Sequence, residues 1–255
     1  MNIRAMVFDL DRTLLRSDKT ISEYTRSVLK RCRDKGIVSV IATARPPRAI
    51  GVYEEMIRPD ASVTMNGASL RMNGRQIRSV SMDAQTARKL IAEIDRRLPG
   101  CSWSLEAESG LYANFDTSAL WGNPPAPIVS VDTVPQERAY KVLAGLRDAG
   151  DAEILRSMLP EDTYLEIAEG TLGMVIHRQA TKMQGVLAAL KELGVKSADT
   201  AAFGDDLADI EMLKACGCGV AVANALDEVK AAADYITASN DEDGVAGWLE
   251  KYVEI

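Results

Sequence analysis

The chain has 255 residues, of which 47% are hydrophobic, so it can bury a sizeable core without a metal or a disulfide. Its formal net charge of −7 and its isoelectric point near 5.0 disfavour general binding to nucleic acid or to an anionic membrane, because both would repel the protein. The four cysteines are scattered, and the sequence shows neither a signal segment nor a run of about 18 apolar residues. These features predict a cytoplasmic protein in a reducing compartment.

The first part of the chain alternates apolar and amphipathic segments. Short apolar runs predict buried parallel strands, and Ser22 is expected to cap a helix that ends near Gly36. Asn73-Gly74, between two alternating stretches, is the strongest hairpin signal in the sequence. The resulting rhythm predicts an α/β fold with a doubly wound parallel sheet. Strands are expected over residues 3–8, 38–42 and 61–65.

The pattern changes near Ser79 to that of an inserted α+β block with an antiparallel sheet. Asp83 is expected to cap a helix whose apolar residues share one face, and a second helix is expected from Pro135 through Leu146. A turn-rich segment at 121–125 interrupts the strands. Strands are expected near residues 102–105, 111–115, 128–131, 152–155, 164–168 and 174–177.

The first architecture then returns. Thr181 is expected to cap a helix that ends at Gly194, strands follow over residues 200–203 and 219–222, and a final helix covers residues 244–252. The sequence therefore predicts a core domain made of residues 1–78 and 180–255, with residues 79–179 inserted as a second domain.

Two acidic clusters follow predicted buried strands. Asp9 and Asp11 come directly after the first strand, and Asp205 and Asp209 follow a late strand at Gly204, which is expected to let the backbone turn sharply. Ligands bind at the carboxyl ends of parallel strands, and alternation would point Asp9 and Asp11 to one side. At about 4 Å, two carboxylates repel by roughly 4 kcal/mol at an effective dielectric near 20, so the clusters predict a hard cation such as Mg²⁺.

Two further residues favour a phosphate ligand. Thr43 follows the second strand beside the exposed amides of a helix start, although a plain helix cap would have the same pattern. Lys182 begins a helix, where the dipole disfavours a cation unless an anion lies close, although an exposed lysine remains an alternative. Cys216 and Cys218 resemble half a zinc site, but with His177 as the single histidine we interpret them as packing residues.

These signals occur in the order found in the haloacid dehalogenase superfamily, and the whole chain resembles its Cof-type phosphatases. The resemblance implies a Rossmann-like core with a large α/β cap of the C2B type, which governs substrate access. Four segments carry it: Asp9-Leu10-Asp11-Arg12-Thr13, Thr43-Ala44-Arg45, Lys182, and the stretch from Gly204 to Leu213.

The resemblance also implies roles for individual residues. Asp9 would be the nucleophile and a magnesium ligand, and Asp11 the acid and base, with its backbone carbonyl on the metal. Asp205 would bind the metal, and Asp209 would support the metal site. The remaining implied contacts are to phosphate, through the Thr43 hydroxyl, the Ala44 amide and Lys182.

Hydrolysis of small phosphorylated metabolites, sugar phosphates above all, through an aspartyl phosphate is the function that this resemblance implies. Arg12 stands where the family usually has glycine, and Ala208 where it commonly has asparagine. Two alternatives stay open, a phosphomutase of the same superfamily and a phosphosugar-binding module without turnover. The expected partner is a small phosphorylated metabolite, not nucleic acid or a membrane, and the protein would be a monomer or a small homo-oligomer.

Overall fold

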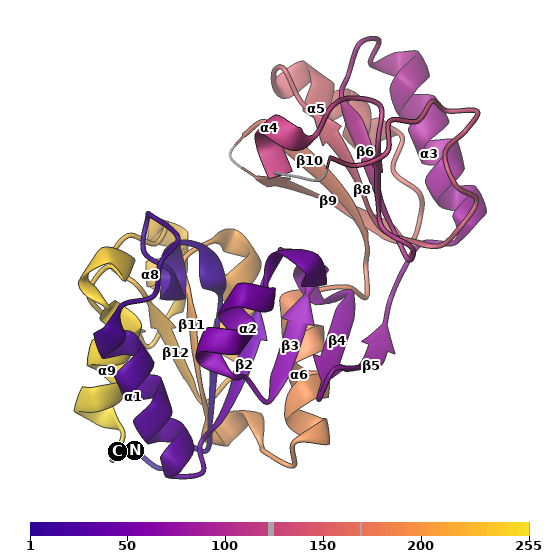
Figure 1. Cartoon of the computed structure of the whole chain (residues 1–255). Coiled ribbons are helices and arrows are strands. Elements are labelled where there is room, and N and C mark those ends of the chain that lie inside the picture. Colours follow the sequence, from indigo (N-terminus) through magenta and orange to yellow (C-terminus); the bar gives the residue numbers. More distant parts are fainter. Residues whose placement is uncertain (122–124, 169, 255) are drawn as a thin grey trace. The chain divides into compact units, whose positions relative to one another are not determined.

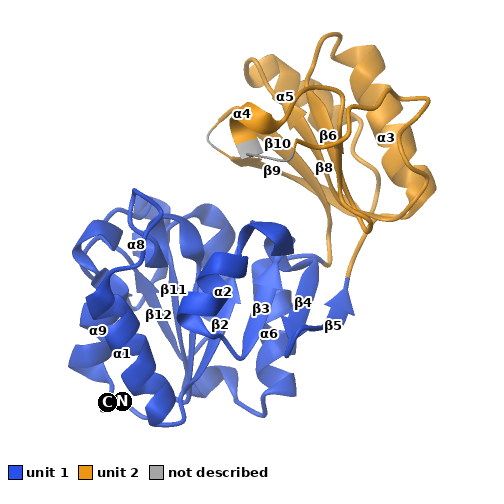
Figure 2. Cartoon of the chain, in the orientation of Figure 1, with its two compact units in different colours: residues 1–79, 180–255 blue, residues 80–179 orange. Residues whose placement is uncertain are grey.

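The computed structural model describes residues 1–121, 125–168 and 170–254. The chain forms two compact units, unit 1 with Met1–Ser79 and Ala180–Ile255, and unit 2 with Val80–Gln179. Figure 2 shows unit 1 in blue and unit 2 in orange. In the part of the chain that the structure describes, no helix is long and apolar enough to cross a membrane.

Unit 1 is built on a sheet whose described strands run in the order β13-β12-β11-β1-β2-β3-β4-β5. All neighbours from β13 to β3 pair in parallel, whereas β4 and β5 are antiparallel additions. The predicted doubly wound parallel sheet is thus confirmed. The strands are β1 (Ala5–Phe8), β2 (Val38–Ala42), β3 (Ala61–Thr64), β4 (Ser69–Met72), β5 (Arg75–Ser79), β11 (Thr200–Gly204), β12 (Cys218–Ala221) and β13 (Tyr235–Ile236).

Helices pack on this sheet in two groups (Figure 1), one in which α1 contacts α9 and α2, the other in which α6 contacts α7. Side-chain caps fix two starts, because Ser22 accepts from the Thr25 amide at 3.0 Å and Thr181 accepts from the Gln184 amide at 3.2 Å. The helices are α1 (Glu23–Asp34), α2 (Gly51–Ile57), α6 (Lys182–Glu192), α7 (Ile210–Ala215), α8 (Asp227–Ala232) and α9 (Gly244–Tyr252).

The hairpin expected at Asn73-Gly74 joins β4 to β5. Both residues have positive φ, 48° and 73°, as a two-residue hairpin turn of this kind requires. The termini also meet, because the amino group of Met1 donates to the carbonyl oxygen of Tyr252 at 2.8 Å (Figure 1).

Unit 2 contains an antiparallel sheet with the order β7-β6-β8-β10-β9. Its core lies between one face of this sheet and two helices, where Trp103 and Val142 pack with Ile91 and Leu155. The elements are α3 (Ala84–Arg97), β6 (Trp103–Ala107), β7 (Leu111–Ala113), α4 (Ser118–Trp121), β8 (Ala139–Gly145), α5 (Ala149–Ser157), β9 (Thr163–Ala168) and β10 (Leu172–His177).

Three predicted elements of unit 2 were wrong. The helix expected from Pro135 through Leu146 is the strand β8, and the strand expected at 152–155 lies inside the helix α5. A central strand buried on both faces and a buried helix give similar apolar runs, so periodicity did not separate them. The strand expected at 128–131 is reduced to a single bridge between Ile128 and Ala113. The predicted turn at 121–125 lies partly outside the described residues.

Candidate active site

The candidate site forms where three adjacent parallel strands end. Phe8, the last residue of β1, pairs with Phe203 of β11 on one side and with Ile41 of β2 on the other. The residues that follow these strands therefore begin at the same level of the sheet. Asp9 is held there by its amide, which donates to the Phe203 carbonyl at 3.1 Å, and Thr43 leaves β2 at the same edge.

Three buried carboxylates meet at this edge. Oxygens of Asp9, Asp205 and Asp209 lie within 4.8 Å of one another. Burial raises the pKa of Asp205 to about 6, and burial also raises the pKa of Asp9 despite the opposing attraction of Lys182. Carboxylates that are costly to ionise together need a cation, and the oxygen donor set fits Mg²⁺. The acidic residues that the sequence singled out around the two strand ends are thus brought together, apart from Asp11.

Lys182 lies inside this group of carboxylates. Its Nζ is 2.7 Å from Asp209 Oδ1 and 3.0 Å from Asp9 Oδ1, and its side chain is 4% exposed. Burial disfavours the charged amine, but the attraction of Asp209 and Asp9 outweighs it and raises the pKa of Lys182 above its ordinary value. The cation at the start of α6, unusual for a helix N-terminus, is explained by these two anions.

Asp209 organises the loop after β11. Its Oδ2 accepts from the amides of Asp205 and Asp206 at 3.0 and 3.1 Å, while its Oδ1 is bound to Lys182. Gly204 allows this close approach, because a Cβ there would lie 2.4 Å from the Asp209 Cβ. Glycine is therefore required at 204 for space, whereas the sequence suggested a sharp turn.

Thr13 and Asn224 are two contributors that sequence reasoning did not assign. The Thr13 hydroxyl donates to Asp205 Oδ1 at 2.6 Å, and both side chains are buried. Arg12 has a left-handed backbone (φ 59°), and the Asn224 side-chain amide donates to its carbonyl at 2.7 Å. The threonine of the Asp-x-Asp-x-Thr motif was a signal that could have found the first contact.

The Asp11 carboxylate is engaged by cations instead of joining the buried carboxylates. Arg45 donates two hydrogen bonds to it, from Nε to Oδ2 at 2.6 Å and from Nη2 to Oδ1 at 2.7 Å. Lys19 Nζ lies 2.8 Å from Oδ1. Partial burial alone would raise the pKa of Asp11, but the hydrogen bonds from Arg45 and Lys19 outweigh it and lower the pKa to about 2. The prediction that Asp9 and Asp11 point to one side was therefore incomplete, because the alternation of side chains along a strand does not show which cations compete for each carboxylate.

The loop that carries Thr43 and Ala44 is braced by the segment Met65–Gly67. The amides of Met65 and Asn66 donate to the carbonyls of Arg45 and Thr43 at 3.0 and 3.1 Å. Thr43 is 1% exposed, and its hydroxyl oxygen accepts from the Arg45 amide at 3.2 Å. The same segment abuts α6, because a Cβ on Gly67 would lie 2.0 Å from the Thr181 carbonyl oxygen. One brace therefore fixes the Thr43 loop and the start of the Lys182 helix.

Comparison with known proteins decides the family. A family model described as haloacid dehalogenase-like hydrolase matches residues 6–249. The chain belongs to this family. It is 30% identical to the 5-amino-6-(5-phospho-D-ribitylamino)uracil phosphatase YitU of Bacillus subtilis, over 98% of this chain and 97% of the relative. It is 28% identical to YcsE of the same organism, which has the same named activity, over 99% of this chain and 97% of the relative.

Solved structures of haloacid dehalogenase-like proteins share the fold. The HAD subclass IIB sugar phosphatase BT4131 matches with a TM-score of 0.86 and 24% identity, covering 98% of both chains. BT1666 from Bacteroides thetaiotaomicron, a phosphatase of the same superfamily, matches with a TM-score of 0.84 and 25% identity over 98% of this chain and 94% of its own. The expected membership of the superfamily is confirmed, and the protein is a phosphatase of this family.

Proposed function

We propose that this phosphatase is magnesium dependent and hydrolyses small phosphorylated metabolites through a phosphorylated Asp9. The observation that carries the proposal is the Asp9 carboxylate itself, which lies 3.0 Å from the buried Lys182 Nζ and within 4.8 Å of oxygens of Asp205 and Asp209. Burying this carboxylate beside two others costs free energy. Groups in such costly surroundings are concentrated at functional sites. Its place at the end of β1 leaves it at the edge of the sheet where ligands bind.

The metal would be held by carboxylate oxygens of Asp9 and Asp205 and by the backbone carbonyl of Asp11. Both oxygens of Asp209 already accept hydrogen bonds, so this residue supports the site by fixing Lys182 and the loop after β11. Thr13 fixes Asp205 in the same way. When bound, Mg²⁺ would supply positive charge next to the phosphoryl oxygens and lower the repulsion between anionic substrate and carboxylate.

The reaction would use two carboxylates in turn. An Asp9 oxygen attacks phosphorus in line, the bond from phosphorus to the ester oxygen breaks, and Asp11 gives its proton to the leaving alcohol. Water then attacks the phosphorus of the aspartyl phosphate, Asp11 accepts the water proton, and inorganic phosphate and the Asp9 carboxylate are restored. Lys182, the Thr43 hydroxyl and the Ala44 amide would stabilise charge on the transferring group.

The contacts of Asp11 add a condition to these two reaction steps. The carboxylate that Arg45 and Lys19 hold is ionised, which suits the second step, where Asp11 accepts a proton. Proton donation in the first step requires that these two cations release Asp11, because a carboxyl group cannot keep its proton between them.

The substrate class is proposed from the relatives and from the insertion. YitU and YcsE are named for a substrate with a phosphorylated ribityl chain, and BT4131 is named a sugar phosphatase. We therefore favour phosphate esters of sugars or sugar alcohols. Unit 2, which is inserted between Ser79 and Ala180, would govern access of the leaving group to the site. A screen of phosphorylated sugars, nucleotides and cofactors with and without Mg²⁺ tests substrate class and metal need together.

Replacing the nucleophile tests the proposal directly. Asp9→Asn should abolish turnover of 4-nitrophenyl phosphate in the presence of Mg²⁺ while the circular dichroism spectrum stays unchanged. The matched control is Asp227→Asn, because the Asp227 side chain is 99% exposed, and this variant should keep full activity. Activity retained by Asp9→Asn would refute Asp9 as the nucleophile.

Asp11→Asn separates the two chemical steps. Nitrophenolate leaves without a proton, so phosphorylation of Asp9 should still occur, whereas loss of the base should slow hydrolysis of the intermediate. A burst of one nitrophenolate per chain, with a mass increase of one phosphoryl group on Asp9, is the expected result. Transfer of labelled phosphate to a second sugar hydroxyl instead of water would identify a phosphomutase.

A further inference from the structure

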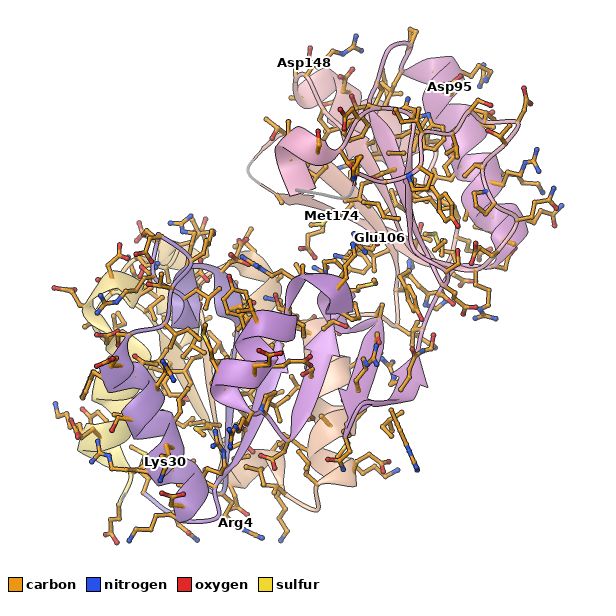
Figure 3. The ribbon with its side chains drawn as sticks, in the orientation of Figure 1. Arg4, Lys30, Asp95, Glu106, Asp148 and Met174 are labelled. Atoms are coloured by element: carbon orange, nitrogen blue, oxygen red, sulfur yellow. The ribbon has the colours of Figure 1, made fainter. Side chains whose placement is uncertain are left out.

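A second charged feature of unit 1 lies away from the carboxylates, in a groove between α1 and the end of α2. The groove is open to solvent and has a volume of about 490 Å³. Arg26, Lys30 and Arg33 line it from α1, and Arg58, which follows α2 as its C-cap, lines it from the other side. Figure 3 labels Lys30 on α1 and shows it on the outer surface of unit 1.

The groove follows from the helical spacing of α1. Positions 26, 30 and 33 are separated by four and three residues, which places them on one face of the helix. The opposite face is buried through Val28 and Leu29, which pack into the core of unit 1. Arg26 and Lys30 therefore lie exposed on the solvent side of α1, whereas Arg33 is partly buried against the end of α2. The helix separates all three from the sheet that carries Asp9.

The groove is positively charged, whereas the whole chain is negatively charged. Four cations and two carboxylates, Glu23 and Glu55, line it, in a protein with a formal net charge of −7. Among the described residues, neither the Arg26 nor the Arg58 guanidinium forms a hydrogen bond or an ion pair. Because α1 and the end of α2 bring these two unpaired guanidinium groups into one groove, both are available to bind an anion.

Lys30 and Arg33 are more firmly held. Lys30 pairs with Asp34 at 2.6 Å, and Arg33 Nη2 donates to the carbonyl oxygen of Ile57 near the end of α2. The Arg33 Nε is buried and has no acceptor in the described part of the chain. Since Arg33 joins α1 to α2, the two walls of the groove are fixed relative to each other before any ligand arrives.

We propose that this groove is a second anion site, separate from the phosphatase centre, for a small molecule with two or more phosphate groups. Arginines from both walls suit bidentate contacts to phosphate oxygens. Glu23 and Glu55 in the same groove, together with the net charge of −7, oppose a long polyanion such as nucleic acid, whose backbone would pass these carboxylates. The proposal does not depend on the role of Asp9.

Calorimetric titration with inorganic tripolyphosphate tests the site in the full chain. A chelator in the buffer keeps metal from carrying the anion to the carboxylates near Asp9. We expect one equivalent to bind. The triple variant Arg26→Gln, Lys30→Gln and Arg58→Gln should bind about tenfold more weakly or worse, because it loses three charge-assisted contacts to the anion. With Mg²⁺, turnover of 4-nitrophenyl phosphate should be unchanged in this variant.

A triple variant with the same loss of charge is the control. Lys191→Gln, Lys196→Gln and Lys214→Gln change three exposed cations of unit 1 outside the groove, and binding should stay at the wild-type level. Absence of binding to the wild type, or equal losses in both variants, would overturn the proposal. Full binding by the groove variant would place the anion elsewhere and overturn it as well. Displacement of the probe by a short DNA duplex would show a nucleic-acid surface instead of a site for a small polyanion.

Discussion

The two units use their sheets differently. In unit 1, β11, β1 and β2 are parallel, so the residues after them, Asp205, Asp9 and Thr43, all emerge at one edge. In unit 2 every pair of neighbouring strands is antiparallel, so successive strands end at opposite edges. A parallel sheet therefore collects the groups that follow its strands, whereas an antiparallel sheet distributes them over two edges. This difference explains why the buried carboxylates of the candidate site all belong to unit 1.

The largest expected effect concerns the buried cation of unit 1. Lys182→Met would leave Asp9 and Asp209 without their shared partner and should lower the free energy of unfolding by about 3–5 kcal/mol. Urea denaturation measures this loss. Lys191→Met, on the exposed side of the same helix α6, is the control and should change stability by less than about 0.5 kcal/mol. A similar small effect at Lys182 would mean that its ion pairs do not hold unit 1 together.

The brace at Met65–Gly67 should be the next most sensitive feature. Gly67→Ala places a Cβ 2.0 Å from the Thr181 carbonyl oxygen at φ 99° and should cost about 2–4 kcal/mol, with a lower kcat because Lys182 follows Thr181. Gly74→Ala is the matched control, since Gly74 also has positive φ (73°) but open space around it. It should cost only about 1 kcal/mol. Equal losses in thermal melts would show that backbone strain, not the contact with α6, makes Gly67 necessary.

Metal binding should stabilise unit 1 selectively and with a defined pH dependence. Folding raises the pKa of Asp205 from 3.8 to about 6. Between these two pH values, the metal-free folded state therefore holds a proton on Asp205 that the unfolded chain has released. This contribution to stability is present below about pH 4 and is lost as the pH rises through about 6. At a hundredfold excess over Kd, Mg²⁺ should add about 2.7 kcal/mol, and more above pH 6 than below it, because protons compete for the same oxygens.

Hydrogen exchange can assign this stabilisation to one unit. Amides of β1 and β11 should gain protection on adding Mg²⁺, and those of β6 and β8 should not. Equal protection in both sheets would contradict a metal site confined to the carboxylates near Asp9. Protection that is strongest below pH 5 would contradict the assignment of the raised pKa to Asp205.

The smallest effect is expected in unit 2. The Asp148 side chain accepts from the Asp151 amide at 3.0 Å and caps α5, so Asp148→Ala should cost about 1 kcal/mol, read as a lower melting temperature. Asp148→Asn keeps an acceptor and should restore most of it. Phosphatase turnover should stay unchanged in both variants. A loss of turnover that exceeds the loss of stability would connect α5 to the chemistry of unit 1.

The sequence predicted unit 1 closely because its signals are local. Ser22 and Thr181 are caps, Asn73-Gly74 is a hairpin turn, and all three lie where the sequence placed them. In unit 2 the cap Asp148 was missed and the apolar run at 139–145 was assigned to a helix, although it is the central strand β8. The choice between helix and strand there depends on β6 and β10, its neighbours in the sheet, which lie far away in the sequence.

The sequence alone determined which acidic and polar side chains follow the predicted strands, because residue type and position along the chain can be read without the fold. Tertiary structure alone decided the partners. Asp9 meets Lys182, Thr13 fixes Asp205, and Asp11 pairs with Arg45. These contacts join segments that lie between 34 and 192 residues apart in the sequence, and they form only once the sheet and its loops have packed.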